Sequence, residues 1–137
     1  MITAADADFH PRDPDEWRWT ETTALIFSIP EARILGNVYV AARPNLGVAL
    51  SGVVLSQGFN RHPYEIDFSD SQMHLPCPPS FVKYELENGL KVECVDPPRE
   101  YRFQYEYKLV KGQPGDDDVV LSKDAATVLI DSLSLQF

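Results

Sequence analysis

Cysteines, basic residues and long apolar runs are all scarce in this sequence of 137 residues. Its two cysteines, Cys77 and Cys94, would pair only in an oxidising compartment, so we expect free thiols. Twelve Lys and Arg against 21 Asp and Glu give a net charge of −9, which argues against a nucleic-acid partner because such partners need a basic patch. No apolar run approaches the roughly 18 residues that span a bilayer. Residues 1–8 also lack the basic start of a signal peptide, so we expect a cytoplasmic protein without a membrane span.

Helical periodicity and the common catalytic motifs are missing as well. No window of 11 or more residues repeats its apolar side chains with the period of an α-helix. The sequence has no glycine-rich phosphate loop, no nucleophile elbow and no Ser-His-Asp signature, which disfavours nucleotide chemistry and serine hydrolysis. We expect no cofactor and no bound metal.

Short β-prone runs are what the sequence does contain. Residues 20–29, 34–43 and 48–57 are rich in Val, Ile, Thr and Tyr, and the segments 30–33 and 43–47 between them carry the Pro, Asn and Gly of turns. These runs predict three strands in succession. Gly52, in the middle of the third run, predicts a bend or bulge.

The second half of the chain adds further predicted strands. Asn88-Gly89 is the strongest turn signal, because both turn positions favour positive φ, and it predicts a hairpin of residues 81–87 and 90–95. We also predict a short strand at 64–68, an irregular crossing at Pro76, Pro78 and Pro79, a strand at 101–109, a solvated loop at 112–118 and a last strand at 127–137.

About eight consecutive strands predict an all-β fold. Eight antiparallel strands close a small up-and-down, lipocalin-like barrel, and a barrel-like sandwich of two sheets fits the pattern almost as well. The proline-rich and charged residues 1–19 form an arm, and residues 20–137 form a single barrel-like domain.

An aromatic face distinguishes the strand at 101–109. Its ladder, Tyr101, Phe103, Tyr105, Tyr107 and Leu109, alternates with Arg102, Gln104, Glu106 and Lys108. Burying side chains of this size stabilises a protein by roughly 1.5–3 kcal/mol each, so the face must be covered. The protein's own second sheet and a bound lipophilic small molecule are both possible covers, and the residues alone leave the two open.

A resemblance to a known family supports the second possibility. The residues that carry it are Trp19-Thr20-Glu21-Thr22, Pro30-Glu31-Ala32-Arg33, Gly36, Tyr39, Arg43-Pro44-Asn45, Gly47, Gly89-Leu90, Cys94-Val95-Asp96-Pro97 and Tyr101. In these positions the sequence resembles the amino-terminal half of the hydroxyneurosporene synthase (carotenoid hydratase)-like proteins, which consist of two lipocalin-like barrels. The Arg-Asp-His-Ser-Trp-Gly run of that family's second barrel is absent from this sequence.

The resemblance implies one half of a two-barrel protein, or a reduced form without its second barrel domain. It implies a cavity for an isoprenoid, steroid or polyketide carrying one or two oxygens, with the acid that hydrates an alkene mostly in the other half. We expect Tyr39, Tyr101, Phe103, Tyr105 and Tyr107 to contact such a ligand.

A structural plug is predicted at the start of the first strand. Lipocalin-like barrels often close one end with a Trp stacked under an Arg, which suggests Trp19 and Arg43, and Glu21 would pair with Arg43 and hold it flat. Replacing Arg43 would then lower the melting temperature substantially.

Other polar sets are weaker candidates for a site. His10, Asp13, Asp15 and Glu16 match no ligand spacing and predict a solvated arm that Phe9 and Trp17 anchor. His62, His74 and Cys77 lack a second ligand pair for zinc. The run 116–118 is too short for a calcium loop and predicts a hairpin tip. Asp67, His62 and Tyr64 remain a possible acid–base set that the fold would have to assemble.

Three functions follow from these observations. The leading hypothesis is a lipophile-binding barrel that forms the binding half of a hydratase-like or cyclase-like protein. The second is a free-standing isomerase, dehydratase or cyclase with its own acid–base pair. The third is a non-catalytic module that forms a homodimer through the open edge of its carboxy-terminal strand.

Overall fold

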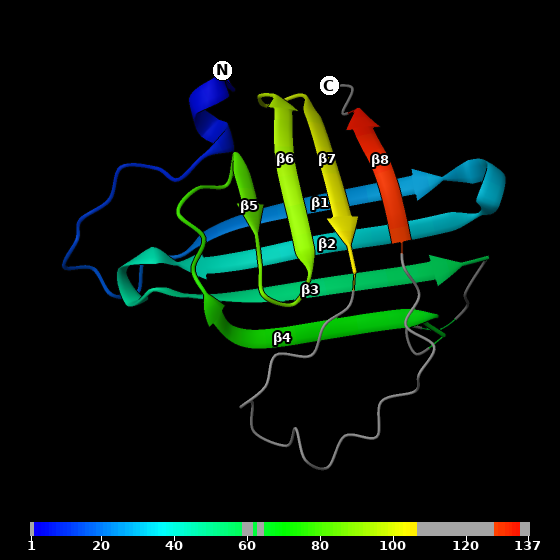
Figure 1. The fold of residues 1–137 in the computed structure, drawn as a ribbon, viewed down its shortest axis with the longest axis horizontal. Helices are drawn as coiled ribbons and strands as arrows, with labels where there is room; N and C mark the ends of the chain where they lie inside the picture. Colours follow the sequence, from blue (N-terminus) through cyan, green and yellow to red (C-terminus); the bar gives the residue numbers. More distant parts are fainter. Residues whose placement is uncertain (1, 59–61, 63–64, 107–127, 135–137) are drawn as a thin grey trace, which may run out of the picture.

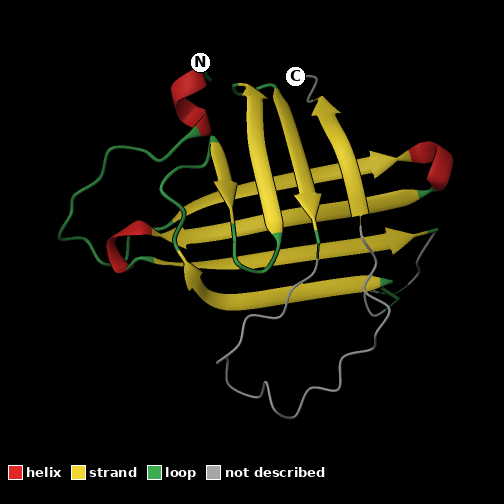
Figure 2. Cartoon of the chain, in the orientation of Figure 1, coloured by secondary structure: helices red, strands yellow, loops and turns green. Residues whose placement is uncertain are grey.

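The fold consists of two antiparallel sheets of four strands each (Figures 1 and 2). The structure is a computed structural model, and it describes residues 2–58, 62, 65–106 and 128–134, without the side chains of 128–134. The first sheet contains β1 (Glu21–Ile29), β2 (Ile34–Arg43), β3 (Val48–Gln57) and β4 (Phe68–Pro76). The second contains β5 (Lys83–Glu85), β6 (Leu90–Asp96), β7 (Glu100–Tyr105) and β8 (Val128–Ser134). The predicted all-β class is confirmed.

Both sheets follow the order of the chain, and the strands of the second run across those of the first (Figure 1). No ladder joins the two sheets within the described residues. Each sheet turns one face toward the other, so the core lies between them, as expected for two stacked sheets.

The predicted turns of the first sheet form as expected. The turn between β1 and β2 is a short 3₁₀ helix, Pro30–Ala32, that ends at Arg33 with φ of 55°. The next turn, Pro44–Leu46, ends at Gly47 with φ of 68°. In each case proline presets the first φ angle and the last residue takes the left-handed conformation that reverses the chain.

The hairpin at Asn88-Gly89 is also confirmed. It joins β5 to β6, and Gly89 has φ of 93°. A Cβ atom at Gly89 would lie 1.7 Å from the carbonyl oxygen of Glu106, so this position requires glycine for space as well as for conformation.

Two details of the strand prediction are wrong. The fourth strand is β4, Phe68–Pro76, rather than residues 64–68, and it ends at the first of the prolines that we expected to lie in a crossing. Because β4 is an edge strand, a terminal proline costs it no ladder hydrogen bond. Gly52 pairs regularly with Tyr39 and Ser71, and the irregular register lies beside it, between Ala49 and Ser51.

Aromatic rings fill the middle of the core. The ring of Phe27 lies over Gly36, its cross-strand partner, so closely that a Cβ atom there would be 2.1 Å from Cζ of Phe27. Phe27 also contacts Phe103 of the second sheet, with ring centroids 5.2 Å apart. The two sheets are therefore joined by direct ring contacts.

Candidate functional site

The aromatic ladder lies on the inner face of the second sheet. Tyr101, Phe103 and Tyr105 are all buried, and Tyr105 is only 1% exposed. Burial, followed by contact with the Cys94 thiol, raises the pKa of Tyr101 to about 12, so its hydroxyl stays neutral. Tyr107 lies outside the described residues. The first sheet therefore covers the aromatic face of β7, which is one of the two covers that the sequence left open.

A polar pair interrupts the apolar interior where β4 faces the end of β7. The hydroxyl of Tyr105 donates to Oδ2 of Asp70 over 2.5 Å, and Nε2 of Gln72 donates to the same oxygen over 3.1 Å. Gln72 is 2% exposed, and the ring of Phe68 lies 5.9 Å from that of Tyr105. Period-two alternation along β4 places Asp70 and Gln72 on one face, toward the core.

Ser51 adds an unused polar group beside this pair. Its register partner on β4 is Gln72, and the residue is fully buried. The Oγ atom of Ser51 has no hydrogen-bond partner within the described part of the chain. Leaving a buried hydroxyl unpaired costs about 1–3 kcal/mol, so this corner of the core contains more polar groups than packing requires.

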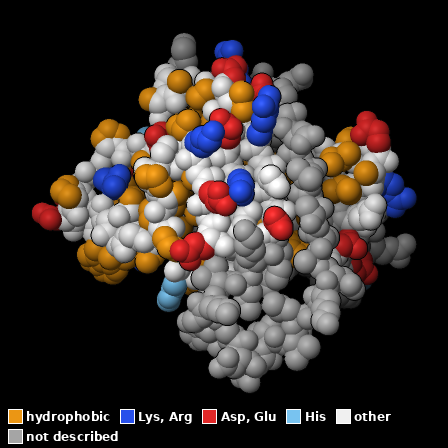
Figure 3. Space-filling model, viewed as in Figure 1, with side chains coloured by type: hydrophobic (Ala, Val, Ile, Leu, Met, Phe, Trp, Pro, Cys, Tyr) orange, Lys and Arg blue, Asp and Glu red, His pale blue; other side chains and the backbone are white. Residues whose placement is uncertain are grey.

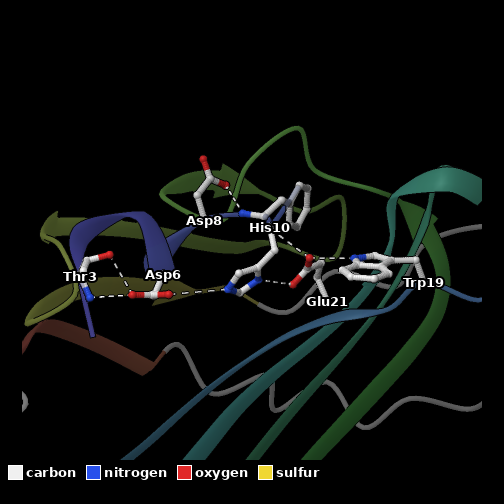
Figure 4. Close-up of polar contacts among 7 residues, drawn as sticks. Thr3, Asp6, Asp8, His10, Trp19 and Glu21 are labelled. Carbon is white, nitrogen blue, oxygen red and sulfur yellow. Dashed lines mark hydrogen bonds and ion pairs between the residues drawn. The ribbon is translucent and has the colours of Figure 1, made fainter. Parts of the chain in front are cut away.

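Glu21, which we expected to pair with Arg43, contacts Trp19 and His10 instead (Figure 4). Oε1 of Glu21 accepts from Nε1 of Trp19 over 2.8 Å and from the backbone N–H of His10 over 3.0 Å. Its other oxygen, Oε2, lies 3.0 Å from Nδ1 of His10. Burial acts against the charge of Glu21, yet these hydrogen bonds lower its pKa, while Glu21 and Asp6 raise the pKa of His10.

Arg43 takes no part in this arrangement, which corrects the sequence-based prediction. Glu21 pairs in register with Ala42, and both point into the core. Arg43 is the next residue along β2, so it points to the opposite face of the sheet, where it is exposed. The ion pair between Glu21 and Arg43 is therefore absent, and His10 replaces Arg43 as the partner.

Residues 8–10, which we call the N-terminal strap, connect the two sheets. Asp8 accepts from the backbone N–H of Phe81 over 2.9 Å and from the Ser80 hydroxyl over 3.0 Å, just before β5. Phe9 packs edge-to-face on Phe81, with ring centroids 4.5 Å apart. His10 then contacts Glu21 at the start of β1. The N-terminal strap thus contacts both sheets, and Phe9 anchors the arm as predicted.

The remaining residues of the arm do not join His10 in a site. Asp13 accepts from the backbone of Asp15, and Glu16 from that of Arg18, so these carboxylates stabilise local turns. Trp17 is 54% exposed, so it does not anchor the arm as predicted.

The other predicted sets do not converge either. No three His, Cys, Asp or Glu side chains of the described residues could hold a metal together. Asp67 accepts from the backbone N–H of Gln57 over 2.6 Å and so closes the turn before β4. His62 is exposed, and Tyr64 and the run 116–118 lie outside the described residues.

Tyr39 is separated from the ladder by the first sheet. Its neighbours Val38 and Val40 are buried in the core, so Tyr39 itself points outward and is half-buried. The structure therefore does not bring Tyr39 together with Tyr101, Phe103 and Tyr105.

Two open hollows formed by described residues lie on the outer faces of the sheets. The larger, of about 600 Å³, crosses the second sheet between charged side chains such as Lys83, Glu93 and Arg102. Figure 3 shows acidic and basic side chains interspersed over this face. The smaller, of about 310 Å³, lies on the first sheet beside Arg43, Leu50 and Met73.

Sequence reasoning missed the Asp70–Tyr105 pair and the His10–Glu21 pair. Asp70 is 35 residues from Tyr105, and His10 is 11 residues from Glu21, so no local spacing connects either pair. Had a strand been predicted at residues 68–76, its alternation would have placed the acidic side chain of Asp70 on the inward face, and that would have been the signal.

Comparison of the chain with protein-family models, with curated proteins and with solved structures finds no match. Within the described residues, no helix is long and apolar enough to cross a membrane. The resemblance to the carotenoid hydratase-like proteins stays a prediction.

Proposed function

We propose that the protein binds a mostly apolar small molecule through a hydroxyl or similar group held by Asp70 and Tyr105. The observation that carries this proposal is the polar corner of the core, where Asp70, Tyr105, Gln72 and the unpartnered Ser51 Oγ converge on otherwise apolar surroundings. A few convergent polar groups in an apolar setting are typical of small-molecule sites.

The position of this corner is suited to ligand entry. Phe27 and Phe103 fill the middle of the core, so the ladder residues there serve packing. Phe68 is only half-buried, and it begins an edge strand beside Tyr105. A ligand would enter by displacing the ring of Phe68, and its hydroxyl would donate to Asp70 and accept from the Ser51 hydroxyl.

The lipocalin-like arrangement belongs to this proposal. Two crossed four-stranded sheets in up-and-down order are the form that a flattened eight-stranded barrel takes. In the two-barrel protein that the resemblance implies, this domain would be the binding half, and its ligand an isoprenoid, steroid or polyketide.

Retinol provides a direct test, because it is a fluorescent isoprenoid with one hydroxyl. We expect saturable binding of retinol, and weaker binding of retinyl acetate, whose hydroxyl is blocked, by about tenfold for one lost hydrogen bond. Tyr105→Phe and Asp70→Asn should reduce the preference for retinol.

Tyr84→Phe is the matched control. The Tyr84 hydroxyl is also buried on the second sheet, and it has no partner among the described residues. Its removal should leave retinol binding unchanged. Absence of saturable binding, or equal losses in Tyr105→Phe and Tyr84→Phe, would refute the proposed site.

A catalytic role has one observation in its favour. The hydrogen-bonded pair of Asp70 and Tyr105 offers a base and a hydroxyl donor to the same interior, as an isomerase or dehydratase requires. Conversion of a bound unsaturated ligand by the wild type, and its loss in Asp70→Asn, would distinguish catalysis from binding alone.

A further inference from the structure

The outer face of the first sheet is almost free of charge. We define the β1–β4 outer face as the alternate positions of 22–28, 35–43 and 48–56, together with residues 69, 71 and 73, all of which point away from the core. Arg43 is the one Lys, Arg, Asp or Glu among these described positions. In a chain of which 24% is charged, a face this large without a carboxylate needs an explanation.

The outer face of the second sheet provides the internal comparison. Its strands β5, β6 and β7 present Lys83 paired with Glu93 over 3.1 Å, Lys91 with Glu85 over 3.1 Å, and Arg102 with Glu100 over 3.6 Å. Interspersed charges of both signs are what a solvated face carries. The same chain therefore treats its two outer faces differently, and only the second has the composition of a surface exposed to water.

Large apolar side chains on the β1–β4 outer face are exposed in the single chain. Ile26 is 65% exposed, Leu35 57% and Met73 53%. They lie on three different strands, so they are spread across the sheet. Exposed apolar side chains on a face without carboxylates are typical of an interaction site.

Gly52 lies in the middle of this face, and no contact among the described residues requires a glycine there. Its φ is not positive, and a Cβ atom there would have no neighbour within 4 Å. Glycine normally weakens a strand relative to alanine. A partner that approaches the backbone of β3 closely would account for it.

We propose that a second copy of this chain docks on the β1–β4 outer face, sheet against sheet. Charge supports this occupant, because two chains of net charge −9 repel one another and can approach only where carboxylates are absent. Area supports it as well. Strands of nine or ten residues give a face about 30 Å long and about 19 Å wide, or roughly 1,200 Å² for two copies, which is the lower end of stable interfaces.

The proposed contact is a two-fold one that buries the same face on both copies. It differs from pairing of open strand edges, because β3 is an inner strand of its sheet and its side chains have no role in edge pairing. It also does not depend on ligand binding in the core. Substitutions on β3 therefore separate this proposal from the alternatives.

Sedimentation velocity over a range from micromolar to several hundred micromolar protein is the test. We expect the wild type to form dimers that strengthen with added NaCl, because salt screens the repulsion between acidic copies and leaves apolar contacts intact. Gly52→Lys should weaken the dimer by more than about 100-fold, since it would bury an unpaired ammonium group. Ile26→Lys should act in the same direction.

Val95→Lys is the matched control, because Val95 is also β-branched and is 42% exposed, on β6 of the second sheet. It should leave the dimer unchanged, and all three variants should retain the wild-type melting temperature when dilute. A wild type that stays monomeric at the highest concentration overturns the proposal. So does a dimer that survives Gly52→Lys, which would indicate edge pairing, or one that salt dissociates.

Discussion

Gly36 gives the sharpest test of how the two sheets are packed. A Cβ atom at this position would lie 2.1 Å from Cζ of Phe27, and the ring of Phe27 also contacts that of Phe103, with ring centroids 5.2 Å apart. Overpacking by one methyl group typically costs about 1–3 kcal/mol. Replacing a glycine in a strand by alanine raises the free energy of unfolding by about 0.5–1 kcal/mol. Gly36→Ala should therefore lower the free energy of unfolding by roughly 1–2 kcal/mol.

Gly52→Ala is the matched substitution for this experiment. Gly52 lies on the neighbouring strand, and a Cβ atom there meets no atom within 4 Å. This variant should gain about 0.5 kcal/mol, so the two alanine variants should differ by about 2 kcal/mol. For a chain of this length the difference corresponds to roughly 5–8 °C in melting temperature, which calorimetry of dilute samples resolves.

A second-site change completes the test. Phe27→Leu removes the ring that an alanine at position 36 would strike, so the double variant should be more stable than the sum of the two single effects predicts, by about 1 kcal/mol. Equal melting temperatures for the Gly36 and Gly52 variants would refute the packing of Phe27 over Gly36, and with it the ring contact between the sheets.

Three further predictions concern the arm and the hairpin. Glu21→Ala should lower the free energy of unfolding by about 1–3 kcal/mol in chemical denaturation, because it leaves the Trp19 indole N–H unpaired. Arg43→Ala should change it by less than about 0.5 kcal/mol, because Arg43 is exposed on the outer face. A larger loss in Arg43→Ala than in Glu21→Ala would support the original prediction of a plug with Arg43. The raised pKa of His10 means that its protonated form stabilises the fold at low pH, and that this contribution is lost as the pH rises through the folded-state pKa, which lies above about 6.5. His10→Gln should therefore flatten the fall of the melting temperature between neutral and mildly alkaline pH, and an unchanged slope would contradict the His10–Glu21 pair. Gly89→Ala should destabilise the protein by more than about 1 kcal/mol, since it combines φ of 93° with a clash against the Glu106 carbonyl; a wild-type melting curve would argue against the described hairpin.

Turn residues made much of the fold predictable. Proline followed by a residue in the left-handed conformation delimits β2 at both ends, and Asn88-Gly89 locates the β5–β6 hairpin. The fourth strand was misplaced because its sequence, Phe68 to Pro76, has no β-branched residue and ends in proline, and local propensity undervalues an edge strand.

Alternation correctly predicted that Tyr101, Phe103 and Tyr105 share an inward face. The error at Arg43 arose because the same alternation was not applied to β2. Neighbouring residues of a strand point to opposite faces. Because Ala42 points inward, Arg43 points outward, and Glu21, the register partner of Ala42, points inward. Glu21 then needs a partner from elsewhere in the chain, and His10 is supplied by an arm without periodic pattern. The Asp70–Tyr105 pair joins different sheets, so only the tertiary arrangement reveals it.

The N-terminal strap has a consequence for how the chain matures during synthesis. Asp8 contacts Ser80 and Phe81, so its partners leave the ribosome more than seventy residues later, which is roughly 4–15 s at ordinary elongation rates. The strands of the first sheet emerge one after another during that interval, and their inner faces stay uncovered until the second sheet follows. A chaperone that recognises nascent apolar surface would therefore meet β1–β3 while His10 has its partner Glu21 but Asp8 still lacks Ser80 and Phe81.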